Sequence, residues 1–267
     1  MTASDDIGAF LKNIILGLLQ GCTEFFPISS SGHLIAAKKI LNLEASLAQD
    51  VALHIATLAA IIIYFRKDIL KLLVHPRRIN MAVLLIVATL PGAGLGFLLS
   101  DWRSNISPWW VVGGWSVSAL YLITSPLAMS NNLKDRLSYT ELPLLRGALI
   151  GTAQAMAIFP GVSRSGSSIV SGLWLGLERE AAFRFSFILS IPIITGAGLK
   201  TALDLDQEQI NIMGGWLPVL SGMAISFFVG LGAIHFLLQF VRKNRLHIFG
   251  WYNFVAAIGF GIYMAFS

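Results

Sequence analysis

Two serine-rich segments hold the residues of this chain that could do chemistry, and each lies within sequence that is otherwise apolar. The second segment, residues 160–168, places Arg164 among small and hydroxyl-bearing residues. A guanidinium is always charged and binds phosphate oxygens through parallel hydrogen bonds. Hydroxyl groups and backbone amides around it would complete an oxyanion site. The segment therefore predicts a phosphate site, formed by Arg164 with Ser163, Ser165, Ser167 and Ser168.

The first segment, residues 20–33, combines a carboxylate, three neighbouring serine hydroxyls and an imidazole. Glu24 lies in apolar sequence, where an ionised group is costly unless it faces a cavity or a partner. His33 follows Ser30 by three residues, so in a helix the imidazole could take the serine proton. A helix that begins here would also present backbone N–H groups to an anion. We predict Glu24, Ser30 and His33 to be catalytic together with Arg164, and we assign substrate binding to Ser29 and Ser31.

Gln20 precedes Glu24 by one helical turn, so the two side chains are expected on one helix face. Two oxygens at this spacing suit a hard cation such as Mg²⁺ or Ca²⁺, with phosphate oxygens of a substrate as further ligands. We therefore expect a divalent cation at Gln20 and Glu24, and Gln20 is also a predicted substrate contact. The single cysteine, Cys22, excludes an intramolecular disulfide and a thiolate metal cage.

The two segments match each other at an offset of 134 residues. The prolines are one position out of step, but other residues pair in register: Gly17 with Gly151, Gln20 with Gln154, Phe25 with Phe159, Ser29 with Ser163, Ser31 with Ser165 and Gly32 with Gly166. This pattern predicts two related halves, approximately residues 7–130 and 141–267, within one membrane domain. A shared site is expected where their polar segments meet.

The composition indicates an integral membrane protein. Of 267 residues, 55% are hydrophobic and 12% are charged, and the mean hydropathy is +0.73. A soluble domain would carry roughly 25% charged residues. The net charge of +5 is interpreted as membrane topology, and binding of nucleic acid is not expected.

The apolar pattern predicts an all-α, polytopic fold. Six stretches are expected to cross the membrane, and residues 7–43 and 147–177 contain shorter pieces that predict two re-entrant helical hairpins. Basic residues at 66–78, 134–146 and 242–247 predict cytoplasmic loops, whereas the loops at 101–105 and 204–208 should be external. The halves would then enter from opposite faces as an inverted repeat, with external access to the site. Lys38 and Lys39 conflict with this scheme.

Other polar residues are given structural interpretations. His54 begins an apolar stretch and is interpreted as a helix-end tie. Arg179, Glu180 and Arg184 are interpreted as charges at the cytoplasmic interface. Tryptophans at helix ends predict an aromatic belt, and these are Trp102, Trp109, Trp110 and Trp216.

The two polar segments resemble motifs of the bacitracin-resistance type of undecaprenyl-diphosphate phosphatase. The first motif is Gln20-x-x-x-Glu24 running into Pro27 through His33, the second is Pro160 through Ser168, and the likeness continues over residues 185–192. Two departures are Gln at position 20, where the family also has Glu, and Ser168, where Thr is usual.

The resemblance implies an enzyme of the bacterial inner membrane that removes the terminal phosphate of undecaprenyl diphosphate. This reaction recycles the lipid carrier of cell-wall synthesis, and the family also implies antibiotic resistance, an inverted repeat and a divalent cation. By motif position, Glu24, Ser30, His33 and Arg164 are the central residues.

Some alternatives stay open at the level of sequence. Inverted repeats with a midplane site recur in secondary carriers, so the chain could transport a polyprenyl phosphate across the bilayer instead of hydrolysing it. Ser30, His33 or water could be the nucleophile. The oligomeric state is open as well, a homodimer included.

Overall fold

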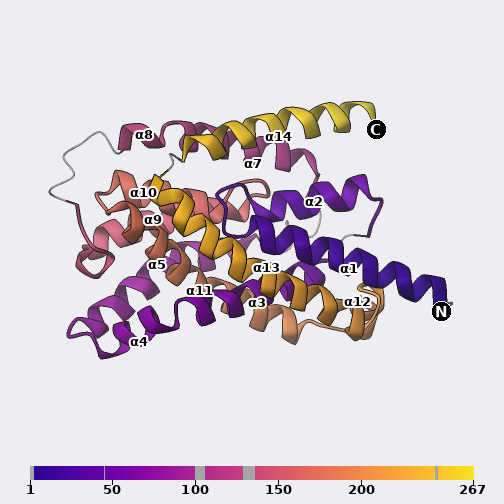
Figure 1. Ribbon diagram of the computed structural model, residues 1–267, viewed down its shortest axis with the longest axis horizontal. Helices are drawn as coiled ribbons and strands as arrows, with labels where there is room; N and C mark the ends of the chain where they lie inside the picture. Colours follow the sequence, from indigo (N-terminus) through magenta and orange to yellow (C-terminus); the bar gives the residue numbers. More distant parts are fainter. Residues whose placement is uncertain (1–2, 45, 100–105, 129–135, 244–245) are drawn as a thin grey trace.

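The computed structural model describes residues 3–44, 46–99, 106–128, 136–243 and 246–267, and this part of the chain is helical almost throughout (Figure 1). The elements, in chain order, are α1 (Ala3–Thr23), α2 (Ser30–Ile40), α3 (Leu47–Tyr64), α4 (Arg66–Val74), α5 (Arg78–Leu98), α7 (Trp109–Ile123), α8 (Ser125–Ala128), η2 (Tyr139–Glu141), α9 (Leu144–Ala155), η3 (Met156–Ile158), α10 (Arg164–Trp174), α11 (Arg179–Leu203), α12 (Gln207–Ile212), α13 (Trp216–Lys243) and α14 (His247–Phe266). The prediction of an all-α fold is confirmed.

Six of the described helices are long and apolar enough to cross a membrane, as predicted. They comprise Leu47–Tyr64, Arg78–Leu98, Trp109–Leu127, Arg179–Leu203, Trp216–Val241 and His247–Phe266. The first begins four residues before the apolar run at Val51, because the side chain of Ser46 caps the helix by accepting a hydrogen bond from the backbone N–H of Gln49.

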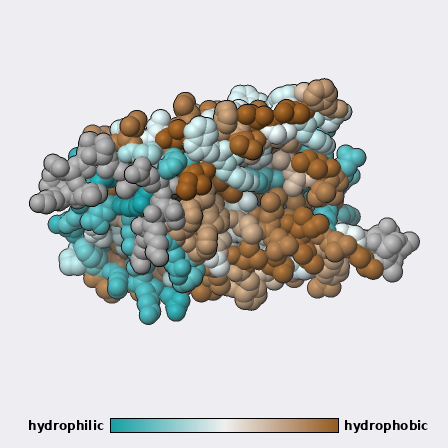
Figure 2. Space-filling model, turned by 45° about the horizontal axis from the view of Figure 1, so that its top comes forward, coloured by the Kyte–Doolittle hydropathy of each residue, from teal (hydrophilic) through white to brown (hydrophobic). Residues whose placement is uncertain are grey.

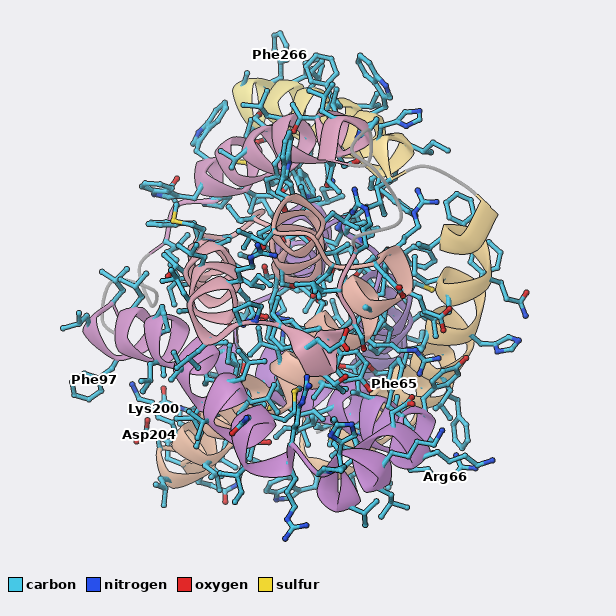
Figure 3. The ribbon with its side chains drawn as sticks, turned by 90° about the vertical axis from the view of Figure 1, so that its left-hand side faces the viewer. Phe65, Arg66, Phe97, Lys200, Asp204 and Phe266 are labelled. Carbon is cyan, nitrogen blue, oxygen red and sulfur yellow. The ribbon has the colours of Figure 1, made fainter. Side chains whose placement is uncertain are left out.

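The surface of the bundle is largely apolar, which is what a membrane-embedded protein requires. Figure 2 shows a broad hydrophobic surface over the middle of the molecule, with hydrophilic residues gathered at one end. Phe97 and Phe266 are exposed and point away from the bundle when it is viewed end on (Figure 3). The chain is therefore a multi-pass membrane protein.

The hydrophilic end of the bundle contains α4, whereas α12 and the N-terminus lie at the opposite end (Figure 1). At the α4 end, Arg184 forms ion pairs with Asp68 and with Glu180, so α11 is joined to α4 by charged groups. Trp102, the predicted external loop at 101–105, and residues 134–135 and 244–245 of two predicted cytoplasmic loops lie outside the described residues.

The position of Lys38 is explained by an ion pair. Its side chain is buried, and Nζ lies 2.5 Å from Oδ1 of Asp50 and 3.2 Å from the carbonyl oxygen of Ser46. Because Asp50 compensates this charge inside the protein, Lys38 does not act as a free basic residue of a loop. Lys39 is exposed.

The helix pairs α1–α2 and α9–α10 each turn back toward the end of the bundle from which they start (Figure 1). The turns of the two pairs are in contact. Ser165 donates a hydrogen bond of 3.2 Å to the carbonyl oxygen of Phe26, and Trp115 on α7 donates one of 3.0 Å to that of Ile28. The re-entrant placement of these hairpins in a bilayer stays a prediction.

Close helix packing recurs at the same offset as the sequence repeat. A Cβ atom on Gly17 of α1 would lie 2.3 Å from the carbonyl oxygen of Gly222 on α13. A Cβ atom on Gly151 of α9 would lie 2.0 Å from that of Ala88 on α5. Gly151 follows Gly17 by 134 positions, and Gly222 follows Ala88 by 134 positions, so the two contacts are equivalent by the repeat. Each hairpin therefore packs on the other half of the chain through small residues, while the exact limits of the two halves stay a prediction.

Candidate active site

The second helix of each hairpin begins in the same way. Ser29 caps α2 by accepting a hydrogen bond of 3.3 Å from the backbone N–H of Gly32, and Ser163 caps α10 by accepting one of 3.0 Å from that of Gly166. The first residues of these helices are Ser30 and Arg164. Free backbone N–H groups and the helix dipole favour negative charge at such helix N-termini.

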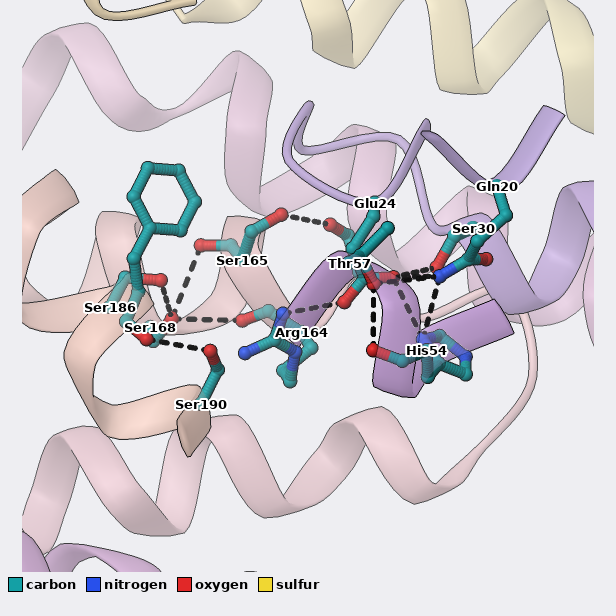
Figure 4. Close-up of polar contacts among 12 residues, drawn as sticks. Gln20, Glu24, Ser30, His54, Thr57, Arg164, Ser165, Ser168, Ser186 and Ser190 are labelled. Atoms are coloured by element: carbon teal, nitrogen blue, oxygen red, sulfur yellow. Dashed lines mark hydrogen bonds and ion pairs between the residues drawn. The ribbon is translucent and has the colours of Figure 1, made fainter. Parts of the chain in front are cut away.

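A buried carboxylate lies between these two helix starts (Figure 4). Oε1 of Glu24 is 2.7 Å from Nη2 of Arg164, and Oε2 accepts hydrogen bonds of 2.5 Å from Oγ of Ser30 and 3.0 Å from Nε2 of Gln20. A buried charge is tolerated when it is paired and hydrogen-bonded in this way. The structure therefore brings Gln20, Glu24, Ser30 and Arg164 together from both halves of the chain.

His54 also belongs to this cluster, although its sequence position suggested only a helix-end tie. Its Nδ1 atom lies 3.1 Å from Oε2 of Glu24 and 2.8 Å from Nε2 of Gln20. Thr57, one turn later on α3, lies 3.4 Å from the same Gln20 atom. A histidine and a threonine three residues apart in the apolar run that begins at Val51 are the signal that could have identified this face. Gln20, Glu24, Ser30, His54 and Arg164 are called the Glu24 site below.

His33 has different partners from those expected. Its Nδ1 atom lies 2.8 Å from the carbonyl oxygen of Ser29, its Nε2 atom lies 2.8 Å from the hydroxyl of Tyr252, and its ring stacks on the Tyr252 ring. The carbonyl of a helix N-cap points along the helix axis, so it meets both the backbone and the ring of the residue four positions later. With both ring nitrogens occupied, His33 does not contact Ser30, whose hydroxyl turns to Glu24 instead.

The other predicted substrate-binding serines contact the backbone or each other. Ser31 lies 3.3 Å from the hydroxyl of Ser29, and Ser163 lies 3.2 Å from that of Ser165. Ser167 donates to the carbonyl oxygen of Arg164, and Ser168 lies 2.6 Å from the hydroxyl of Ser186 on α11 (Figure 4). None of these hydroxyls hydrogen-bonds to Glu24 among the described residues. The serines of the second segment hold the start of α10, and with it Arg164, against its neighbours.

The described side chains do not provide the pair of oxygens expected for a divalent cation at Gln20 and Glu24. Gln20 turns its amide nitrogen to the carboxylate, because an ionised carboxylate accepts hydrogen bonds and does not donate them. The Gln20 carbonyl oxygen is buried, and no residue in the described ranges hydrogen-bonds to it. No cluster of three His, Cys, Asp or Glu side chains occurs in the described ranges. A single carboxylate is thus the whole charged contribution of the described residues to such a site.

The Glu24 site has the groups that phosphoryl transfer needs. Arg164 keeps a second nitrogen, Nη1, that is buried and has no hydrogen-bond partner among the described residues. The Ser30 hydroxyl donates a hydrogen bond to the Glu24 carboxylate, which is the arrangement of a nucleophile beside its base. Two helix N-termini add positive potential. The arrangement can therefore bind a phosphate group and move it to a hydroxyl oxygen.

Comparison with known proteins agrees with this chemistry. The family described as "Bacitracin resistance protein BacA" matches residues 13–259. The chain is similar to undecaprenyl-diphosphatase from Trichlorobacter lovleyi, with 40% identity over 93% of this chain and 95% of the relative. It is also similar to undecaprenyl-diphosphatase from Rubrobacter xylanophilus, with 38% identity over 92% and 95%. Undecaprenyl-diphosphatase 3 from Bacillus cereus is 36% identical over 91% and 93%.

Proposed function

The chain belongs to the BacA family of bacitracin resistance proteins and is an undecaprenyl-diphosphatase, and we propose that it hydrolyses the terminal phosphate of undecaprenyl diphosphate at the Glu24 site. The observation that carries this proposal is the contact of one buried carboxylate with both a serine hydroxyl and an arginine from the other half of the chain. Phosphate release by purified protein in detergent tests it. Without two compartments, transport produces no phosphate, so this assay also separates hydrolysis from transport.

Arg164 and the two helix N-termini would bind the terminal phosphate. Nη2 of Arg164 holds Glu24 and thereby orients the guanidinium, and Nη1 is left for a phosphate oxygen. The backbone N–H groups at the starts of α2 and α10 add partial positive charge on the same side. Charge stabilisation by fixed donors is the main catalytic contribution in phosphoryl transfer.

Ser30 would then act as the nucleophile, with Glu24 as its base. Oγ of Ser30 forms a bond to the terminal phosphorus, the bond from this phosphorus to the bridging oxygen breaks, and undecaprenyl phosphate leaves. The hydroxyl proton passes to Glu24 along the existing 2.5 Å hydrogen bond and is then lost to water. In the second step water attacks the phosphoserine. Glu24 takes a proton from this water and returns it to Oγ of Ser30, which releases phosphate.

Glu24→Gln tests the base. The substitution keeps the shape of the side chain but removes its charge and its proton affinity, so kcat is expected to fall by about 10²- to 10⁴-fold. Phosphate release is the measurement, and Glu44→Gln is the matched control because Glu44 is exposed. Turnover of Glu24→Gln close to that of the unchanged protein would contradict the assignment.

We propose that a divalent cation binds at the Glu24 site and that the substrate supplies most of its ligands. Glu24 would provide the carboxylate, and phosphate oxygens would complete the coordination, as in many Mg²⁺ sites. When bound, the cation would add positive charge at the phosphate oxygens. We expect a chelator to abolish phosphate release and added Mg²⁺ or Ca²⁺ to restore it. An unchanged rate in chelator would leave Arg164 and the helix N-termini as the only stabilising charges.

The lipid part of the substrate fits a multi-pass protein. The prenyl chain would lie in the bilayer against the exposed apolar faces of the spans, and the site would open to the external side of the inner membrane. Assembly as a homodimer stays a prediction.

A further inference from the structure

We infer that His54 is a substrate-binding residue, whose Nε2–H group donates a hydrogen bond to a phosphate oxygen of the bound diphosphate. This inference rests on the proposed function of the Glu24 site and adds to it a group that neither polar motif contains. Three observations support it: the exposure of the side chain, the contacts that occupy Nδ1 and leave Nε2 without a partner among the described residues, and the residue at the equivalent position of the other half.

The His54 and Arg164 side chains of the Glu24 site are partly exposed, whereas the carboxylate is buried. The His54 side chain is 25% exposed and that of Arg164 is 16% exposed, whereas that of Glu24 is 2% exposed. A phosphate group that approaches Ser30 and Glu24 therefore meets these two side chains. Arg164 is the charged donor of this pair, and His54 is the second donor.

The Nδ1 atom of His54 faces the interior of the cluster, 2.8 Å from Nε2 of Gln20 and 3.1 Å from Oε2 of Glu24. Glu24 is paired with Arg164, so it is ionised, and only the NH₂ end of Gln20 can face its Oε2 atom. The same amide nitrogen lies 2.8 Å from Nδ1 of His54 and 3.4 Å from the hydroxyl of Thr57. In the proposed arrangement Nδ1 accepts from Gln20, which puts a ring proton on Nε2. No described residue hydrogen-bonds to Nε2, so this donor is available to a ligand.

Packing does not explain the imidazole. At the offset of 134 residues, His54 corresponds to Ile188, Thr57 to Ile191 and Glu24 to Ile158. The related half thus forms the same helix with isoleucine at this position. Gln154, which corresponds to Gln20, is buried, and neither polar atom of its amide has a partner among the described residues. Among the described residues, the Gln20 amide nitrogen has polar partners, whereas the Gln154 amide has none. His54 therefore accompanies Glu24 and is not a general requirement of this helix.

Two substitutions separate a role of Nε2 from a role of Nδ1. The amide nitrogen of His54→Gln reaches about as far as Nε2, whereas His54→Asn keeps polar atoms only near the position of Nδ1. We expect His54→Asn to lower kcat/KM by about 10- to 100-fold, the usual effect of losing a hydrogen bond to a charged group, and His54→Gln to keep most of it. Inorganic pyrophosphate should inhibit His54→Asn less strongly than His54→Gln, by a similar factor.

His235→Asn, on the exposed face of α13, is the matched control. If His54→Asn is active and His54→Gln is impaired, the ring only positions Gln20 through Nδ1, and the inference is overturned. It is also overturned if both variants bind pyrophosphate as the unchanged protein does. Loss of His54 function can be told apart from failure of the proposed site, because an active Arg164→Ala protein would refute the site whatever the His54 variants do.

Discussion

Arg164→Ala is expected to reduce phosphate release by about 10³- to 10⁵-fold, the range found when an arginine that stabilises a transferring phosphoryl group is removed. The substitution removes the guanidinium that forms an ion pair of 2.7 Å with Glu24. The measurement is the steady-state rate of phosphate release in detergent at saturating substrate. Arg78→Ala, at the exposed start of α5, is the matched control.

Loss of the guanidinium also leaves Glu24 buried without its partner. Breaking a buried ion pair costs about 3–5 kcal/mol, so the alanine protein could fail to fold. Arg164→Lys avoids this problem, because it keeps the charge and loses only the planar fork. We expect this protein to insert and to melt near the temperature of the unchanged protein, yet to remain well over 10-fold slower. A lysine variant with normal kcat would show that charge alone is sufficient.

Ser30→Ala is expected to lower kcat by about 10³-fold or more, the scale seen when a catalytic nucleophile is deleted. The hydroxyl that donates to Glu24 is lost, and water would have to attack without its help. Incubation with substrate labelled at the terminal phosphate, stopped with acid, should leave label on the unchanged protein and none on Ser30→Ala.

Ser116→Ala is the control for this substitution, since the Ser116 hydroxyl donates to its own helix on an exposed face of α7. Substantial activity of Ser30→Ala, together with no labelled protein in any variant, would favour direct attack by water. Activity with persistent labelling would move the nucleophile to another serine of the hairpin turns.

The amino-acid sequence alone predicted the features that depend on local pattern. Runs of apolar residues identified the six spans, since a helix of given length and polarity crosses a bilayer largely independently of its neighbours. The serine, glycine and arginine pattern identified both hairpin turns, because N-capping is a local interaction. A charged residue in apolar sequence requires a partner, so Glu24 and Arg164 were expected to meet.

The tertiary structure decided which side chains surround Glu24. His54 joins the site from α3 because that helix packs beside the first hairpin, and no spacing in the sequence contains this contact. His33 shares a helix with Ser30 but turns to Tyr252, 219 residues away in the sequence. Gln20 has the predicted spacing from Glu24, yet the charge of the carboxylate selects the nitrogen of its amide over the oxygen. Sequence spacing determines which residues share a helix face, whereas the direction of a side chain depends on the charges and helices packed against it.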